Sequence, residues 1–228
     1  MATELYTRLQ TELKRLGLYK STIDGNWGPG SHAAFCTARE MVRGGKAGDM
    51  NAELTGYCKA VAWSAKVTPA FITRLKDITA RLGMRTPDEM ISCMAFETGE
   101  TFSPTIKNGA GAPYYGLIQF GAAAAKDAGT TLEALLKMTA EQQLDYVYNF
   151  FKPYANRLQT LSDVYMRILL PVAVGKPEDY NLFLDGTKAY LQNRGLDINK
   201  DGKITKAEAA AMVTAKLVRG LDPAFLRV

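Results

Sequence analysis

The stretch MISCMAFETGETF, residues 90–102, predicts a helix that carries a carboxylate on its apolar side. Met90, Cys93 and Met94 precede Glu97 by seven, four and three residues, which places all four side chains on one helical face. Burial removes hydration from a carboxylate, raises its pKa and makes it a candidate general acid. Two other interpretations stay open: Glu97 pairs with a buried Lys or Arg, or it only marks the end of the apolar face.

Capping residues mark two helix starts near this stretch. Thr86-Pro87-Asp88-Glu89 has the form of a capping box with proline at the first helical position, and Gly99 is expected to end that helix. Thr68 is expected to cap a preceding helix that begins at Pro69. One face of that preceding helix carries Phe71, Ile72, Leu75, Ile78 and Leu82.

The rest of the chain also predicts helices, so the expected fold class is mainly α. Further helices are expected at residues 131–152, 160–170, 179–194 and 205–219, with at most a small hairpin at 105–120. No segment shows the sustained alternation that is typical of strands. The sequence predicts a small helical module, residues 1–60, followed by a larger α-helical domain, residues 61–228.

Composition restricts the class of protein. The 228 residues are 47% hydrophobic and 22% charged, as in a soluble globular protein, and no apolar run approaches the roughly 20 residues of a membrane span. Charges in MATELYTRLQ occupy the place of a signal peptide's apolar core, so no Sec export signal is expected. The three cysteines predict reduced thiols. A net charge of +5, spread along the chain, favours an anionic polymer without selecting nucleic acid, lipid or bacterial wall.

The single histidine, His32, excludes several kinds of chemistry. Zinc hydrolases with two or three His ligands and Cys₂His₂ fingers need more histidines than this chain has. A Ser-His or Cys-His nucleophile could use only His32, and no nucleophile motif surrounds it. Carboxylate chemistry is the class that remains.

The N-terminal segment LQTELKRLGLYKSTIDGNWGPGSHAAF, residues 9–35, resembles the bacterial peptidoglycan-binding repeat, a three-helix module. The resemblance implies wall binding, with Asp24, Gly25 and Trp27 as the residues expected there. The pattern fades beyond Phe35, where the third helix of the module is not evident. The alternative is a small helical hairpin in which the Asp-Gly and Gly-Pro dipeptides only make turns. The matching positions are Leu9, Gln10, Leu13, Leu16, Gly17, Tyr19, Ile23, Asp24, Gly25, Trp27 and Gly28.

A second motif follows Glu97 in YYGLIQF, residues 114–120. A glutamate at a helix end followed by Gly-Leu-Ile-Gln resembles the goose-type lysozymes and lytic transglycosylases, over about residues 65–195. That resemblance implies a lysozyme-like fold with Glu97 as general acid/base. It also implies that Gly116 and Gln119 belong to the sugar cleft.

Three further positions are matched to this family with less support. Thr98 keeps the hydroxyl of the serine that usually follows the family's glutamate, and Tyr115 lies beside the second motif, where it is expected to contact substrate. The family's third motif, built around Ala-Tyr-Asn, has only a partial counterpart in Ala189-Tyr190. Tyr190 is therefore an expected substrate residue with an incomplete motif around it.

Together the two resemblances indicate a modular phage endolysin that cleaves the MurNAc-β-1,4-GlcNAc bond of Gram-negative walls. Glycosidases that hydrolyse this type of bond usually pair two carboxylates. Glu100 is expected to face water, and Asp127 and Asp145 lie in no recognisable motif. A single glutamate favours a lytic transglycosylase, in which Glu97 protonates the leaving oxygen and the C6 hydroxyl closes a 1,6-anhydro ring. Hydrolysis of the same bond, by a muramidase, is the alternative.

The segment DINKDGKITKAE, residues 197–208, fits the calcium-binding loop of EF-hands at every ligand position. Thr205-x-x-Glu208 is also a capping box, so a capped turn without metal is the alternative. If Ca²⁺ binds, its role is expected to be structural, and no cofactor is expected for catalysis. The predicted calcium ligands are Asp197, Asn199, Asp201, Lys203 through its carbonyl, and Glu208.

Other functions stay open at this stage. A non-catalytic glycan-binding protein would keep the fold without turnover, and a virion-associated lysin would use the same chemistry during entry. The expected partner is bacterial peptidoglycan, without nucleic acid or stable membrane insertion, and the expected state is a monomer. The expected location is the host cytoplasm, followed by holin-dependent release to the periplasm.

Overall fold

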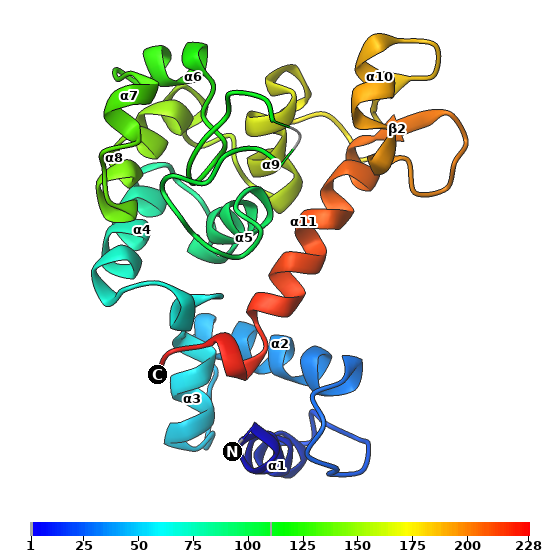
Figure 1. Cartoon of the computed structure of the whole chain (residues 1–228). Helices are drawn as coiled ribbons and strands as arrows, with labels where there is room; N and C mark the ends of the chain where they lie inside the picture. The colour runs from blue at the N-terminus through cyan, green and yellow to red at the C-terminus, as the bar shows by residue number, and fades with distance from the viewer. Residues whose placement is uncertain (1, 110) are drawn as a thin grey trace. The chain divides into compact units, whose positions relative to one another are not determined.

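The protein is mainly helical in the computed structural model, which describes residues 2–109 and 111–228 (Figure 1). The chain forms two units: residues up to Ala65 together with Val218–Val228, and Lys66–Leu217. The sequence-based division at residues 60 and 61 left the C-terminal segment in the wrong unit. Leu226 belongs to the hydrophobic core of the first unit, and the ring of Phe225 lies 4.8 Å from that of Trp63.

In its described residues, the first unit has three complete α-helices around one apolar core. The third helix, which the sequence left unclear, begins after Asn51, whose side chain accepts a hydrogen bond from the Leu54 N–H at 2.8 Å. The core includes Leu9 and Leu13 from the first helix and Phe35 from the second. The three helices are α1 (Ala2–Arg15), α2 (Pro29–Arg43) and α3 (Ala52–Lys59).

Gln10 of α1 holds the loop between α1 and α2. Its side chain is fully buried, and its Nε2 donates to Asp24 Oδ1 at 3.0 Å and to the Asn26 carbonyl at 2.8 Å. Its Oε1 accepts from the Gly25 N–H at 2.9 Å. Gly25 has φ +70°, and a Cβ there would lie 2.6 Å from Thr3 Cγ2, so glycine is required. These bonds explain the Gln and Asp-Gly of the N-terminal motif as parts of one folded loop.

We expect Gln10→Ala to lower the free energy of unfolding of the first unit by about 3 kcal/mol, because it leaves several buried backbone and side-chain groups without partners. Urea denaturation measures the loss. Thr11→Ala is the control, since Thr11 is exposed on the same helix and should change stability by less than about 0.5 kcal/mol. Equal stabilities of the two variants would contradict this role for Gln10.

The second unit contains eight α-helices among its described residues, including the C-terminal α11, which continues into the first unit. Thr68 caps α4 as predicted, because its Oγ1 accepts from the Phe71 N–H at 3.1 Å. Thr86 also caps α5 as predicted, but the expected bond from Glu89 back to Thr86 is replaced by other contacts. The Thr86 hydroxyl donates to Asp88, and the Glu89 carboxylate lies near Arg85. The helices are α4 (Pro69–Arg81), α5 (Pro87–Glu97), α6 (Ala122–Asp127), α7 (Leu132–Leu135), α8 (Ala140–Phe151), α9 (Leu161–Leu169), α10 (Lys188–Asn193) and α11 (Lys206–Gly220).

Two sequence-based predictions of elements were wrong in detail, whereas the expectation of at most a small hairpin at 105–120 was not. The helix expected at 131–152 is divided into α7 and α8, because Thr139 forms a capping box that starts α8. The helix expected at 179–194 is confined to α10, since β1 (Asn181–Leu184) pairs antiparallel with β2 (Lys203–Thr205). At 105–120 the described residues form only isolated bridges, Lys107 with Tyr115 and Tyr115 with Phe120.

Within the second unit, α4 packs on α8, and α5 packs on α4 and α9. Figure 1 shows α10 and β2 at the N-terminal end of α11. A buried ion pair joins that end of α11 to α9: Lys206 Nζ lies 2.7 Å from Asp163 Oδ1. None of the helices in the described part of the chain is both long and apolar enough to cross a membrane.

Candidate active site

Glu97 is the last residue of α5 and lies where the apolar face of that helix ends. Met90, Cys93 and Met94 on the same helix are fully buried. The side chain of Glu97 is partly buried, and most of its carboxylate is surrounded by protein. The helical spacing therefore predicted the position of this carboxylate correctly.

The environment of Glu97 favours its protonated form. Burial alone raises its pKa to about 7, and no charge or hydrogen bond from the described residues offsets that effect. Cys93 and Tyr165 are neighbours of Glu97. Burial raises the pKa of both groups, and the nearby charge of Glu97 raises it further. Tyr165 of α9 also packs edge-on against Phe96, with ring centroids 5.5 Å apart, which fixes α5 against α9. A carboxyl with these properties is able both to donate and to accept a proton near neutral pH.

The turn after Glu97 is held by Thr98. This side chain is fully buried, and its hydroxyl donates to the Met94 carbonyl at 2.7 Å and accepts from the Phe102 N–H at 3.0 Å. The hydroxyl expected to contact substrate is thus used inside the protein. Thr98 serves to direct the chain away from the helix end.

Hydrolysis would need a second carboxylate besides Glu97, and two of the three candidates form ion pairs elsewhere. Glu100 does not face water as expected: it is 18% exposed and pairs with Lys216 of α11 at 2.6 Å. Asp145 forms an ion pair with Arg74 on the surface. Asp127, at the end of α6, remains as the acid that lines a pocket.

The second motif forms a tight turn that depends on glycine. Gly116 has φ +77°, and a Cβ at this position would lie 2.5 Å from Gln143 Oε1. Gln143, on α8, is fully buried; its Oε1 accepts from the Leu117 N–H at 3.2 Å and its Nε2 donates to the Pro104 carbonyl at 2.7 Å. Gln143 thereby joins the segment after Glu97 to the second motif.

Sequence reasoning missed Gln143, although a signal was present. Gln143 precedes Val147 by four residues, and both lie on the buried face of α8. A polar residue on an apolar helical face is the same signal that identified Glu97. In α8 it marks a residue that organises a loop.

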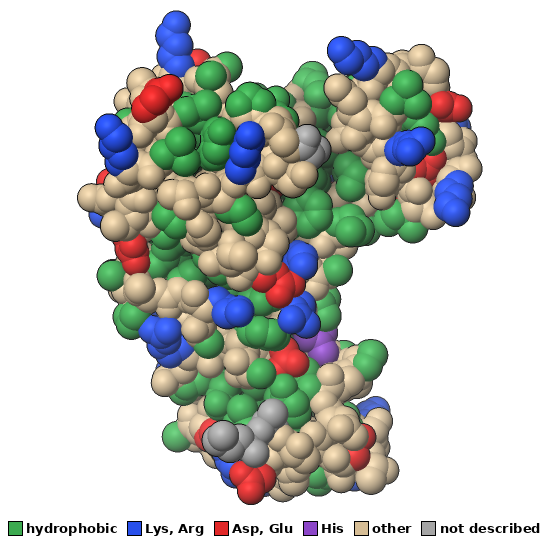
Figure 2. Space-filling view, viewed as in Figure 1, with side chains coloured by type: hydrophobic (Ala, Val, Ile, Leu, Met, Phe, Trp, Pro, Cys, Tyr) green, Lys and Arg blue, Asp and Glu red, His purple; other side chains and the backbone are tan. Residues whose placement is uncertain are grey.

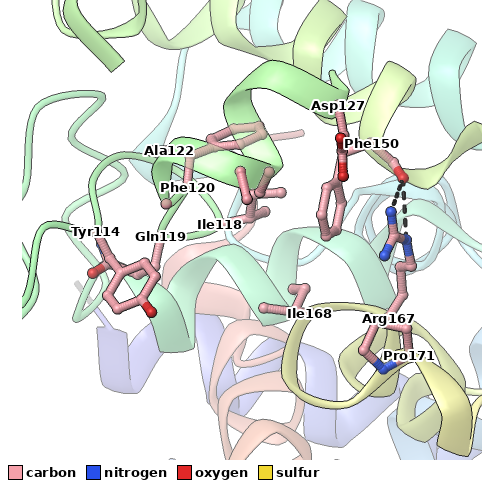
Figure 3. A pocket seen from close by; sticks show the side chains of 13 residues that line it. Tyr114, Ile118, Gln119, Phe120, Ala122, Asp127, Phe150, Arg167, Ile168 and Pro171 are labelled. Carbon is pink, nitrogen blue, oxygen red and sulfur yellow. Dashed lines mark hydrogen bonds between the residues drawn. The ribbon is translucent and has the colours of Figure 1, made fainter. Parts of the chain in front are cut away.

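A pocket of about 370 Å³ lies between the second motif, α6, α8 and α9 (Figure 3). Gln119 lines it, with φ +53° and a buried Oε1 that has no hydrogen-bond partner in the described part of the chain. Tyr114, 46% exposed, also lines the pocket, whereas Tyr115 and Glu97 are not among its described lining residues. The tyrosine that lines the pocket is therefore Tyr114, and not its neighbour Tyr115, which was expected to contact substrate.

The other end of the pocket was not predicted from the sequence. Arg167 lies over the ring of Phe150, 3.8 Å from its centroid, and donates to the Phe150 carbonyl at 2.8 Å (Figure 3). Burial lowers the pKa of Arg167, and the charge of Asp127 acts against that effect. The pocket thus combines aromatic surface, a cation and a carboxylate.

Tyr190 lies at the predicted calcium loop. Its hydroxyl donates to Asp197 Oδ2 at 2.7 Å, which raises the pKa of the phenol to about 12. The structure does not bring Tyr190 into the pocket at the second motif. Residues 197–208 follow a short 3-10 helix, Arg194–Leu196, and run through β2 to the first turn of α11. Among the described residues, no three His, Cys, Asp or Glu side chains are close enough to hold a metal ion.

The predicted wall-binding residues mainly build the loop that contains them. Asp24 is exposed and accepts from Gln10 and from the Asn26 N–H at 3.0 Å. Trp27 packs between Tyr6 and Phe35, with ring centroids 5.4 and 5.6 Å away. Lys and Arg side chains are spread over the face in Figure 2, in agreement with their spread along the sequence.

No protein-family model, curated protein or solved structure matches this chain.

Proposed function

We propose that this protein cleaves the MurNAc-β-1,4-GlcNAc bond of bacterial peptidoglycan, as a phage endolysin, with Glu97 as general acid/base. The observation that carries this proposal is the carboxyl at the end of α5, which has no charge partner among the described residues and whose pKa burial raises to about 7. A buried carboxyl without an ion-pair partner is destabilising unless it stays protonated, which is the form that a general acid needs. Sugar binding alone gives no reason for such a group.

In the proposed reaction, Glu97 donates its proton to the glycosidic oxygen as the bond to C1 of MurNAc breaks. The N-acetyl oxygen of the same sugar bonds to C1 and stabilises the developing positive charge. The Glu97 carboxylate then removes the proton of the C6 hydroxyl, whose oxygen displaces the N-acetyl oxygen and closes a 1,6-anhydro ring. Glu97 is returned to its protonated form, so this lytic transglycosylase needs no second carboxylate.

Hydrolysis of the same bond is the second candidate, because Asp127 supplies a carboxylate to the pocket. Asp127 lines the pocket together with Gln119 and Arg167. Hydrolytic glycosidases usually use two carboxylates, one of which acts on water or on C1. In this muramidase, Asp127 would be the partner of Glu97, and the product would carry a reducing end.

The pocket supplies the proposed sugar contacts. The Gln119 Oε1 is a buried acceptor without a partner among the described residues, and a sugar hydroxyl or N-acetyl N–H satisfies such a group. Tyr114 offers an exposed ring for stacking at the same pocket. Gly116 contributes through the turn that positions Gln119.

Mass spectrometry of the fragments released from purified sacculi tests the reaction. A transglycosylase yields 1,6-anhydro-MurNAc ends, which are lighter by one water than the reducing ends that a muramidase yields. Release of only peptide fragments, or of nothing, would reject both forms of the proposal. The second outcome would favour a non-catalytic glycan-binding protein.

We propose that the first unit attaches the enzyme to the wall. Leu13→Asp places a charge in its core, where Leu13 is fully buried, and should unfold this unit. Pelleting with purified sacculi should fall several-fold, while cleavage of short soluble glycans persists. Thr11→Asp is the control, because it adds the same charge on the exposed side of α1. Equal pelleting of both variants would show that the first unit does not mediate attachment.

A further inference from the structure

The loop between α10 and α11 carries a pattern of oxygen atoms that the proposed cleavage does not use. Asp197, Asn199 and Asp201 occupy ligand positions 1, 3 and 5 of a calcium loop, and Glu208 occupies position 12. Gly202 stands at position 6, where such loops turn sharply, and it has φ +80°. The structure thus has the required turn at the required residue.

The loop is folded around the first ligand position. The Gly202 N–H donates to Asp197 Oδ2 at 3.1 Å. The Asn199 Oδ1 accepts from the Asp201 N–H, and the Asp201 Oδ1 accepts from the Lys203 N–H, both at 2.9 Å. These bonds turn the side chains at positions 1, 3 and 5 towards the backbone of their own loop.

Two carboxylate oxygens of this loop are buried without a hydrogen-bond partner in the described part of the chain. They are Asp197 Oδ1 and Glu208 Oε1, at ligand positions 1 and 12. Asp197 as a whole is only 8% exposed. The other oxygen of each carboxylate accepts hydrogen bonds, Asp197 Oδ2 from the Tyr190 hydroxyl at 2.7 Å and Glu208 Oε2 from Thr205. Buried anionic oxygens of this kind are stabilised by a cation.

The capping box explains only one oxygen of Glu208. Its Oε2 accepts from the Thr205 N–H at 2.9 Å and from the Thr205 hydroxyl at 2.8 Å, while the Glu208 N–H donates to Thr205 Oγ1 at 3.2 Å. Because Oε1 takes no part in these bonds, the cap and a metal ion can use the same residue.

The two ends of the loop are fixed by packing. Ile204, at position 8, is fully buried and pairs with Phe183 across the β1–β2 ladder. Lys206 anchors the start of α11 to Asp163 of α9. The Asp201 side chain is exposed instead, and its Oδ2 accepts a hydrogen bond from Asn199 Nδ2 at 3.3 Å. Asn199 and Asp201 are both exposed, so closing around an ion requires these two side chains to move inward.

We propose that residues 197–208 bind one Ca²⁺ through Asp197, Asn199, Asp201, the Lys203 carbonyl and Glu208. The ion satisfies the two unpaired buried oxygens and ties α10 to α11. The ion contributes to the stability of the second unit. It takes no part in bond cleavage, because its ligands are separate from Glu97. Calcium is the cation proposed because the ligand set is all oxygen and its spacing is that of a twelve-residue calcium loop.

Glu208→Gln separates the two roles of this residue. Glutamine also serves in a capping box, so the variant keeps the cap and loses the anionic ligand. In excess chelator it should melt with wild-type stability. With free Ca²⁺ a hundredfold above Kd, the wild-type folded-to-unfolded ratio should rise about 100-fold. That corresponds to a rise in Tm of about 5–10 °C, which Glu208→Gln should lack.

Titration calorimetry of the full chain with CaCl₂ measures binding directly, with Asp197→Asn as a second variant and Asp179→Asn as the matched control. Asp179 is an exposed carboxylate outside the loop, so its variant should bind Ca²⁺ like wild type. One site in wild type and loss of binding in both loop variants is the expected result. Identical melting of metal-stripped wild type with Ca²⁺ and with chelator would overturn the proposal, as would equal binding of Mg²⁺.

Discussion

Glu97→Gln is expected to reduce cleavage of purified sacculi by about 10²- to 10⁴-fold, the range typical of a lost general acid. Glutamine keeps the shape of the side chain and removes the proton. Release of soluble muropeptides measures the rate. Glu133→Gln is the control, because Glu133 is an exposed glutamate of the same unit. If Glu97→Gln retained more than about a tenth of the wild-type rate, Glu97 would not be the acid.

The same substitution is expected to stabilise the protein above neutral pH. The pKa of Glu97 is raised from 4.5 to about 7 by folding, so the folded state holds a proton that the unfolded state has lost between these values. The free energy of unfolding therefore falls as pH rises through this window. Glu97→Gln lacks this loss and should gain about 3 kcal/mol relative to wild type between pH 4 and pH 8.

Urea denaturation of both proteins at the two pH values measures this gain. An inactive variant that is more stable at high pH is the result expected of a buried catalytic acid. A variant destabilised at pH 8 would instead indicate that Glu97 is a paired structural carboxylate. Wild-type activity should also decline as pH rises through about 7, because the protonated form of Glu97 is lost.

Lys206→Met should lower the free energy of unfolding by about 3–5 kcal/mol, the loss typical when one partner of a buried ion pair is removed. Lys206 is 2% exposed, and its Nζ lies 2.7 Å from both Asp163 Oδ1 and the Lys176 carbonyl. Removing the cation leaves the Asp163 carboxylate buried without its charge partner. Thermal and urea unfolding measure the effect, with Lys76→Met as the exposed control in the same unit.

A double variant tests whether the buried charge is the cause. Lys206→Met combined with Asp163→Asn should be less destabilised than the sum of the two single changes, because no uncompensated charge remains. Burial raises the pKa of Asp163, but hydrogen bonds from Lys206, Gly175 and Thr160 outweigh that effect and lower it. The stability contributed by this pair is therefore present above about pH 4 and lost as pH falls further. Strict additivity would contradict this account.

Local sequence determined the helix starts and the position of Glu97. Thr68 and Thr86 cap α4 and α5 because a hydroxyl satisfies backbone N–H groups only a few residues away. The apolar face that ends at Glu97 also follows from spacing within one helix. Information of this kind lies within a dozen residues, so a single sequence is sufficient to read it.

Tertiary contacts decided the pocket and the loops. Gln143 fixes the turn at Gly116 from a different helix, and Arg167 and Phe150 complete a pocket that no motif marks. The pKa of Glu97 depends likewise on the protein that surrounds it, including Tyr165 of α9.

The β1 strand and the C-terminal segment show why these features escape a local reading. Leu182–Leu184 is a short apolar run that suits a helix or a strand, and pairing with residues 203–205 makes it a strand. Leu226 joins the core that Leu9 and Leu13 form at the opposite end of the chain. In both cases the deciding partner is distant in sequence: strand pairing selects the conformation of β1, and burial in a shared apolar core fixes Leu226.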